Sequence, residues 1–256
     1  MLKMGITRSV SLAGLLASAA LIPVSADHHG KQEHIAAAVA NADRPATDTE
    51  RDADRKPQDV LAFAGVKPGM TVVDINSGGG YYTEILSHAV GADGKVYAHN
   101  GPLYWNFVST RVGERFENRL PNVVQVHADT ENVMADAGSV DLAITVLAYH
   151  DYYFLPEGRE GPADVSAILA SVYKSLKPGG SFVVVDHVAP EGAEPTTGNT
   201  THRIDPAFVR KQIEAAGFKF AAASSVLTNP DDDHKRGVFD KDIRGKTDRF
   251  VYKFVK

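Results

Sequence analysis

Cysteine is absent from the 256 residues of this chain. Its absence excludes a disulfide framework, a thiol nucleophile, a zinc–thiolate site and an iron–sulfur cluster. A basic excess is also absent, because 32 Asp and Glu outnumber 27 Lys and Arg and leave a net charge of −5. Proteins that bind nucleic acid generally carry a basic excess, so no nucleic-acid partner is predicted. With 43% hydrophobic and 23% charged residues, the composition is that of an ordinary globular protein.

Long hydrophobic runs are scarce too. The apolar stretch 10–21 is shorter than the roughly 20 residues that a transmembrane helix needs. It follows the positive charges of Lys3 and Arg8 and precedes a group of small residues that ends at Ala26, which is the pattern of a secretory signal peptide. We therefore expect residues 1–26 to be a signal peptide cleaved after Ala26, and the mature protein to be periplasmic or secreted. The alternative is an uncleaved anchor.

After a polar lead-in over residues 27–55, with some helix, the chain alternates strand and helix patterns. Apolar, β-branched runs typical of buried parallel strands lie at 71–75, 95–99, 123–126, 139–148 and 181–186. Helices are predicted at 57–64, 81–89, 105–120, 163–176 and 205–216. No helix pattern separates the last two strands, 218–227 and 249–255, so we expect an antiparallel hairpin there. The prediction is one α/β domain over residues 56–256, with a doubly wound, mostly parallel seven-stranded sheet that binds ligands beyond the carboxyl ends of its strands.

A glycine-rich loop, Asp74 to Gly80, follows the first predicted strand and opens a helix. The loop lacks the third glycine of the dinucleotide fingerprint, and the chain has no phosphate-binding P-loop motif. Glycines here let a ligand approach the backbone closely. Because Asp74 precedes the glycines, the loop suits a cationic ligand, such as an ammonium or a sulfonium, better than a pyrophosphate.

These motifs together resemble those of class I S-adenosylmethionine-dependent methyltransferases, which have a Rossmann-like fold. The matching pieces are Lys-Pro-Gly at 67–69, the glycine-rich loop, and Leu-Lys-Pro-Gly-Gly at 176–180. More narrowly, the chain resembles a group of secreted or periplasmic predicted methyltransferases, through segments at 78–82, 150–151, 202–205 and 244–250. The resemblance implies an exported transferase that uses S-adenosyl-L-methionine to methylate a small molecule.

The resemblance also implies which residues bind the cofactor. Asn76 stands where the family has the first glycine of its loop, and Asn100 stands where the family has an acid that holds the ribose hydroxyls. Asp129 matches the position that contacts the adenine amino group. The full predicted cofactor set is Asp74, Asn76, Gly78, Gly80, Tyr82, Asn100 and Asp129.

Candidate chemistry gathers where the fourth predicted strand ends. His150 titrates near neutrality and Asp151 can orient it, so the pair is predicted to be catalytic, with His150 as the base. Asp186 and His187 end the fifth predicted strand on the same rim, and Asp205 is expected to cap a helix. The predicted substrate-binding residues are Tyr149, Tyr152, His187, His202 and Arg203.

No metal site is predicted, and the acidic run 231–234 is interpreted as a solvated loop. Two other functions stay open at this point, because a fold does not fix a function. One is a non-catalytic protein that binds a small molecule or a nucleoside on a methyltransferase fold. The other is an enzyme that uses the same pocket for non-methyl chemistry.

Overall fold

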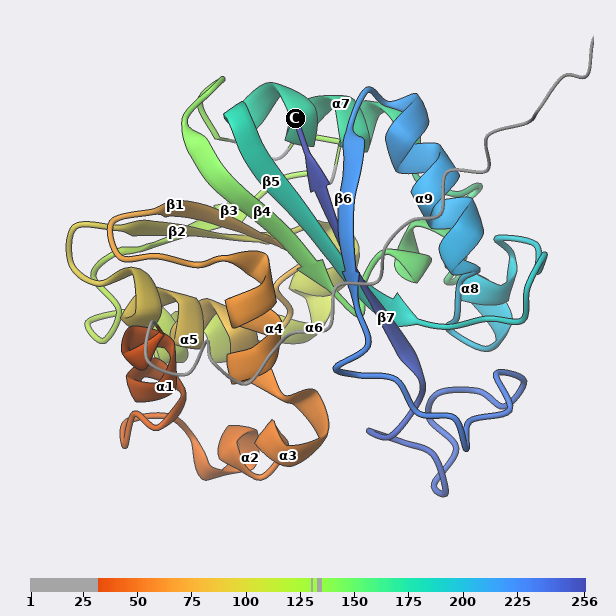
Figure 1. Ribbon diagram of the computed structural model, residues 1–256, viewed down its shortest axis with the longest axis horizontal. Helices are drawn as coiled ribbons and strands as arrows, with labels where there is room; N and C mark the ends of the chain where they lie inside the picture. The colour runs from red at the N-terminus through yellow and green to blue at the C-terminus, as the bar shows by residue number, and fades with distance from the viewer. Residues whose placement is uncertain (1–31, 130, 133–134) are drawn as a thin grey trace, which may run out of the picture.

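The computed structural model describes residues 32–256 except 130, 133 and 134. The predicted signal peptide and the first residues of the lead-in lie outside the described residues. A seven-stranded sheet in the order β3-β2-β1-β4-β5-β7-β6 forms the centre of the molecule (Figure 1). Its strands are β1 (Thr71–Ile75), β2 (Lys95–Asn100), β3 (Val123–His127), β4 (Val140–Val146), β5 (Leu176–His187), β6 (Lys219–Ser224) and β7 (Arg249–Val255).

The pairing of the strands confirms the predicted fold. Strands β1 to β5 pair in parallel, whereas β7 runs antiparallel between β5 and β6. The larger helices are α4 (Pro57–Ala64), α5 (Tyr81–Val90), α6 (Pro102–Phe116), α7 (Val165–Ser175) and α9 (Pro206–Ala215), and the shortest helices include α8 (Thr197–Thr200). Helix α6 begins before the predicted boundary at residue 105, because Pro102 after Gly101 occupies the first helical position, where a missing N–H costs nothing.

Alternate residues of the strands bury two faces of the sheet. Val72 packs in one apolar cluster with residues of α4 and α5, while Val73 packs in a second cluster with residues of α7 and α9. In Figure 1, α4 and α5 lie to one side of the sheet and α7 and α9 to the other. Burial on both faces explains why the parallel strands are continuous apolar runs.

Local signals set both ends of α4 and the start of α9 where the sequence predicted them. Pro57 begins α4, and Gly65 ends it in the left-handed conformation at φ 81°. Asp205 caps α9 as predicted, since its side chain accepts a hydrogen bond from the Ala207 N–H at 2.9 Å. Strand β5 begins at Leu176, before its predicted start at residue 181, and its pairing to β4 is irregular between Val140 and Leu142.

Residues 32–55, the described part of the lead-in, form three helices, α1 (Glu33–Val39), α2 (Ala46–Thr49) and α3 (Asp52–Arg55), which pack on the domain. Ile35 of α1 is fully buried in the same cluster as α4 and α5. Asp52 accepts hydrogen bonds from Arg44 at 2.7 Å and from the Tyr81 hydroxyl at 2.5 Å. The part of the lead-in that the structure describes is therefore an integral part of the fold.

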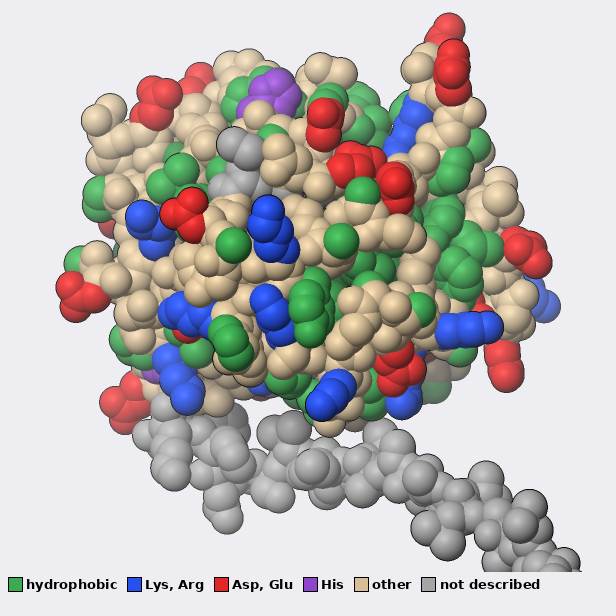
Figure 2. Space-filling view, turned by 90° about the horizontal axis from the view of Figure 1, so that it is seen from above, with side chains coloured by type: hydrophobic (Ala, Val, Ile, Leu, Met, Phe, Trp, Pro, Cys, Tyr) green, Lys and Arg blue, Asp and Glu red, His purple; other side chains and the backbone are tan. Residues whose placement is uncertain are grey.

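The surface carries both signs of charge. On the face seen in Figure 2, Lys and Arg side chains are interspersed with Asp and Glu, so neither sign dominates that face. Among residues 32–256, excepting the undescribed positions, no helix combines the length and the apolar character needed to cross a membrane.

Candidate functional site

Two adjoining cavities lie beyond the carboxyl ends of the parallel strands. The first has a volume of about 410 Å³ and the second of about 370 Å³. Both are of the size that small-molecule sites have in proteins. Leu103 and Tyr104 of α6 and Asp151, which follows β4, line both cavities, so a ligand in one is next to a ligand in the other.

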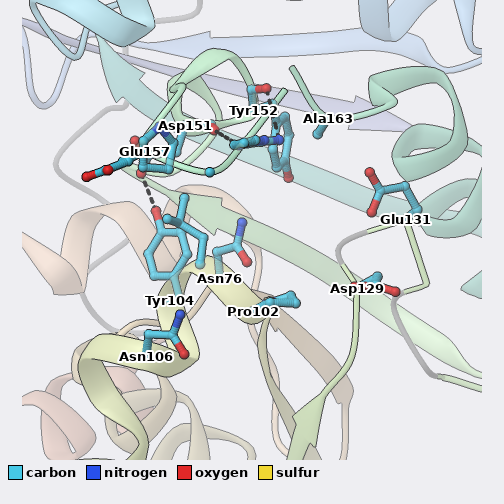
Figure 3. A pocket seen from close by; sticks show the side chains of 14 residues that line it. Asn76, Pro102, Tyr104, Asn106, Asp129, Glu131, Asp151, Tyr152, Glu157 and Ala163 are labelled. Atoms are coloured by element: carbon cyan, nitrogen blue, oxygen red, sulfur yellow. Dashed lines mark hydrogen bonds between the residues drawn. The ribbon is translucent and has the colours of Figure 1, made fainter. Parts of the chain in front are cut away.

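The first cavity is rich in carboxylates. Figure 3 shows Asp129 and Glu131 on one side, Tyr104 of α6 on the other, and Asn76 of the glycine-rich loop between them. The full lining is Asn76, Pro102, Leu103, Tyr104, Asn106, Asp129, Glu131, Asp151, Tyr152, Pro156, Glu157, Gly158, Arg159 and Ala163. Four of these carry carboxylates and one a guanidinium, and Arg159 donates to backbone carbonyls, at 2.9 Å to Phe154 O. The excess of negative charge favours a cationic ligand.

Asn100 holds the glycine-rich loop in place through hydrogen bonds and does not line the first cavity. Its side-chain oxygen accepts a hydrogen bond from the Gly78 N–H at 2.9 Å, and its amide nitrogen donates to Ser77 Oγ at 3.0 Å and to Gly78 O at 3.2 Å. The side chain is 1% exposed and both of its polar atoms are used. The predicted contact of Asn100 with ribose hydroxyls therefore does not fit this geometry, and the residue fixes the loop.

Gly80 is required by the packing of α6. A Cβ atom at this position would lie 2.6 Å from Phe116 Cζ, and the residue has φ 85° at the start of α5. No described atom comes within 4 Å of the corresponding point at Gly78, where the backbone is open to a ligand. Asn76 also has a left-handed backbone, at φ 51°, and it does line the first cavity. Of the predicted cofactor residues, Asn76 and Asp129 line this cavity.

Asp74 lies near the end of β1, just before the glycines of the loop, and is 2% exposed. Its carboxylate accepts a hydrogen bond from Thr83 Oγ1 at 2.7 Å. Burial raises the pKa of Asp74 to about 7, although the bond from Thr83 and the charge of Arg115 both act to lower the pKa. Asp74 does not line either cavity, so its predicted direct contact with a ligand does not fit this structure.

The raised pKa of Asp74 makes stability depend on pH. Between about pH 4 and pH 7 the unfolded chain loses this proton while the folded chain keeps it, so the free energy of unfolding falls as the pH rises. We expect Asp74→Asn to remove this loss and to raise Tm by about 5 °C or more at pH 8, with little change at pH 4. Thermal melts at both pH values check this, with the exposed Asp93→Asn as the control. An equal Tm difference at both pH values contradicts it.

His150 lines the second cavity. It lies in the 3₁₀ helix η2 (His150–Tyr153) and is 3% exposed. Its Nδ1 lies 2.7 Å from Asp186 Oδ1, and its Nε2 lies 3.3 Å from Asp151 Oδ1. Burial acts to lower the pKa of His150, but Asp186 and Asp151 outweigh it and raise this pKa to about 10. Asp186, more than Asp151, orients His150. With a proton on both nitrogens at neutral pH, His150 is a cation there, and the predicted role of base is not favoured.

His187 differs from His150 in charge. Burial lowers its pKa well below the ordinary value, and the neighbouring charges of His150 and Arg249 act in the same direction. Its Nδ1 lies 2.6 Å from Thr247 Oγ1, and among the described residues its Nε2 has no hydrogen-bond partner. His187 lines the second cavity as a neutral imidazole, which is the form that accepts a proton.

His202 reaches the second cavity from the segment that follows β5. Its Nδ1 lies 3.5 Å from Asp151 Oδ1, and its ring packs on Phe154 and Phe239 at centroid distances of 5.0 Å and 4.9 Å. His202 has φ 55°, and Leu147 in the same lining has φ 57°. Left-handed backbone at non-glycine residues costs energy and concentrates at functional sites. The prediction that His202 helps to form a binding pocket agrees with this placement.

Three further predicted residues, Arg203, Tyr149 and Tyr82, also lie away from both cavities. Arg203 is fully buried and forms a two-point ion pair with Asp232, each bond 2.9 Å long, so no substrate reaches its guanidinium. The interpretation of 231–234 as a solvated loop is accordingly wrong at Asp232, which is 5% exposed. Tyr149 is fully buried and donates to Gln212 Oε1 at 2.8 Å. Tyr82, 4% exposed, lies near the carbonyl of Arg55 and outside both linings.

The sequence reasoning missed Tyr104 and did not place the carboxylate of Asp186 against His150. Tyr104 donates a hydrogen bond to Asp151 Oδ2, and it lies between the cavities. The Gly-Pro signal at the start of α6 was available to place it. Asp186 was noted at the end of β5, but its contact with His150 depends on how β4 and β5 end side by side, which no local pattern reports.

Comparison with known proteins identifies the family. The model of the ubiE/COQ5 methyltransferase family matches residues 54–197, which is more than half of the chain. The chain belongs to the ubiE/COQ5 methyltransferase family. It is 28% identical over 186 residues to the ubiquinone/menaquinone biosynthesis C-methyltransferase UbiE of Marinomonas, a match covering 71% of this chain and 68% of that protein. It is 29% identical over 161 residues to a demethylmenaquinone methyltransferase of Staphylococcus epidermidis, covering 63% of this chain and 55% of that protein.

Solved structures share the fold. An S-adenosylmethionine-dependent methyltransferase of Aquifex aeolicus has a TM-score of 0.58 at 21% identity, covering 85% of this chain and 96% of that one. An arsenic(III) S-adenosylmethionine methyltransferase of Chlamydomonas reinhardtii has a TM-score of 0.53 at 16% identity, covering 87% of this chain and 72% of that one. The family membership and this fold confirm the predicted class I methyltransferase, with S-adenosylmethionine as the cofactor of the family. The acidic first cavity beside the glycine-rich loop fits a sulfonium compound.

Proposed function

We propose that this protein transfers the methyl group of S-adenosylmethionine to a hydroxylated aromatic small molecule. The observation that carries the proposal is the pair of adjoining cavities, one acidic and next to the glycine-rich loop, the other lined by aromatic rings and histidines. The donor occupies the first cavity, where Asp129 and Asn76 hold the nucleoside part. The acceptor occupies the second cavity. The shared lining at Tyr104 and Asp151 marks where the two ligands meet.

The lining of the second cavity supports an aromatic acceptor. Phe107, Phe154 and Phe239 supply apolar faces, whereas His187, His202 and Asp151 supply polar atoms. A flat ring with a hydroxyl group matches this combination, since the ring is buried against the aromatics and the hydroxyl reaches the histidines. The names of the two curated relatives, which concern quinone biosynthesis, point to the same class of acceptor.

The proposed reaction needs one proton acceptor. The bond between sulfur and the methyl carbon breaks as a new bond forms between that carbon and the acceptor, which leaves S-adenosylhomocysteine. His187, neutral and with a free Nε2, takes the proton that the acceptor loses. Positive charge at His150 stabilises the acceptor oxygen as it becomes anionic.

Calorimetric titration tests the donor site. We expect S-adenosylmethionine and S-adenosylhomocysteine to bind with one site per chain. Asp129→Ala is expected to weaken both about tenfold, because a charge-assisted hydrogen bond to the nucleoside is lost. The exposed Asp93→Asn serves as the control. Absence of binding at millimolar ligand contradicts the proposal, and so does affinity that is unchanged in Asp129→Ala.

We also propose that the protein is exported and belongs with the secreted or periplasmic methyltransferases that it resembles. The support is the sequence of residues 1–26, with positive residues, a short apolar run and small residues in order. Mass spectrometry of the protein from its native host tests this. The mass of a chain beginning at Asp27 is expected, and a chain that retains residues 1–26 contradicts the proposal.

A further inference from the structure

Three potential ligand atoms converge in the second cavity. Asp151 Oδ1 lies 3.3 Å from His150 Nε2 and 3.5 Å from His202 Nδ1, and all three atoms lie within 4.8 Å of one another. A transition-metal ion that binds nitrogen and oxygen at about 2.1 Å holds neighbouring ligands roughly 3.0–3.4 Å apart. The arrangement therefore needs only small side-chain adjustments to place one ion at the centre of the three atoms.

A second layer of hydrogen bonds orients these atoms. Asp186 Oδ1 lies 2.7 Å from His150 Nδ1, and Asp186 Oδ2 accepts from the His150 backbone N–H at 2.8 Å. When a metal ion displaces the Nε2 proton, the proton on Nδ1 stays hydrogen-bonded to Asp186 and the Nε2 lone pair faces the cluster. Metal-binding histidines commonly have such a carboxylate on their other nitrogen, which fixes the tautomer and the ring. Tyr104 donates to Asp151 Oδ2 and leaves Oδ1 for the cluster.

The electrostatics of the cluster favour a cation at its centre. His150 Nε2 lies 3.3 Å from Asp151 Oδ1, and the Asp186 carboxylate lies on the other side of the His150 ring, so the cluster carries two carboxylates. A metal ion takes the place of the Nε2 proton and contacts both His150 and Asp151. His202 is kept in place for the third contact by its packing on Phe154 and Phe239, in spite of its left-handed backbone.

We propose that His150, Asp151 and His202 bind one divalent transition-metal ion, such as Zn²⁺, in the acceptor cavity. Two imidazole nitrogens and one carboxylate oxygen suit a metal of the first transition row better than Mg²⁺ or Ca²⁺, which prefer oxygen ligands. Three protein ligands leave at least one position for an oxygen of the small molecule in the cavity. Binding of the ion requires neither Asn76 nor Asp129, so it is measured without S-adenosylmethionine, and a bound ion supplies the positive charge that the proposed function assigns to His150.

Metal titration of the full chain tests this inference. The protein is first treated with a chelator and dialysed, and ZnCl₂ is then added at pH 7.5 in a calorimeter, with CoCl₂ as a second, coloured probe. We expect one ion per chain and a visible Co²⁺ absorption band of a nitrogen–oxygen site. His202→Ala and Asp151→Ala are each expected to weaken binding at least tenfold, and Asp186→Asn to weaken it about 10-fold to 100-fold.

Two control variants separate this site from other histidines. His127 is exposed on β3 and stacks on Trp105, so His127→Ala is expected to leave the affinity unchanged. His28 and His29 lie outside the described residues, and the double variant His28→Ala/His29→Ala is expected to keep one site.

Circular dichroism confirms that each variant is folded. His202 has a side chain that is 20% exposed, so its truncation is the least disruptive of the ligand changes. The inference is overturned if no ion binds at about 1 mM Zn²⁺, if folded His202→Ala binds as tightly as the parent, or if the double variant loses the site. Failure of S-adenosylmethionine to bind, by contrast, bears on the proposed function alone.

Discussion

Replacement of His187 by Ala is expected to lower kcat for methyl transfer by about 100-fold or more. His187 is the neutral imidazole of the acceptor cavity, and removal of a general base typically costs 10²–10⁴ in rate. The affinity for S-adenosylmethionine is expected to stay within about threefold of the parent, because His187 does not line the donor cavity. The assay uses labelled S-adenosylmethionine and 1,4-dihydroxynaphthalene as the probe acceptor.

The pH dependence of kcat distinguishes a base at His187, whose pKa is lowered, from a base at His150, whose pKa is raised. Because the pKa of His187 is lowered, the base stays unprotonated through the ordinary histidine range, and the parent rate is expected not to fall as the pH is lowered through that range. His127→Ala, a change at an exposed histidine of β3, is the activity control. A His187→Ala variant that retains more than about a third of the parent kcat would show that this residue is not the base.

Arg203→Ala is expected to destabilise the fold by about 3–5 kcal/mol. The substitution leaves Asp232 buried without its two bonds from the guanidinium, and breaking a buried ion pair on one side costs this much. Two further contacts disappear, to the carbonyl of Val188 at 2.9 Å and to that of Arg236 at 2.8 Å. Urea denaturation gives the free energy of unfolding for parent and variant.

The chain offers a matched control for this ion pair. Arg236 pairs with Asp233 at 3.1 Å, but both side chains are largely exposed, at 38% and 47%. Arg236→Ala is therefore expected to change stability little, since exposed pairs contribute little. The double change Arg203→Met/Asp232→Leu is expected to recover part of the loss, because it removes both buried charges. A loss below about 1 kcal/mol in Arg203→Ala would show that Arg203 is available for another partner.

Local chemistry explains why the sheet was predictable. Thr71–Ile75 is buried on both faces and lies between a Lys-Pro-Gly turn and a glycine-rich loop, so the strand is bounded by its own sequence. Pro57 and Gly65 likewise mark the first and last turns of α4 from within its own sequence. The antiparallel place of β7 followed from the lack of a helix pattern before it. In each case the deciding interactions lie within the element or at its ends.

The site was less predictable because its contacts join distant segments. His150 and His202 were each singled out, but their convergence on Asp151 depends on how the segment after β5 folds back over the end of β4. Arg203 was predicted to bind substrate, and its pairing with Asp232 was not predictable because Asp232 lies in a segment without regular structure. The role of Asn100 depends on the path of the glycine-rich loop, which sequence spacing does not specify.

A crystal structure with S-adenosylhomocysteine and the probe acceptor tests the two-cavity account most directly. The account predicts the nucleoside beside Asp129 and Asn76, the sulfur near the shared lining at Tyr104 and Asp151, and the ring among Phe154 and the cavity histidines. The hydroxyl of the acceptor is expected within hydrogen-bond distance of His187 Nε2. A nucleoside bound outside the first cavity, or an acceptor bound away from the second, would contradict the account.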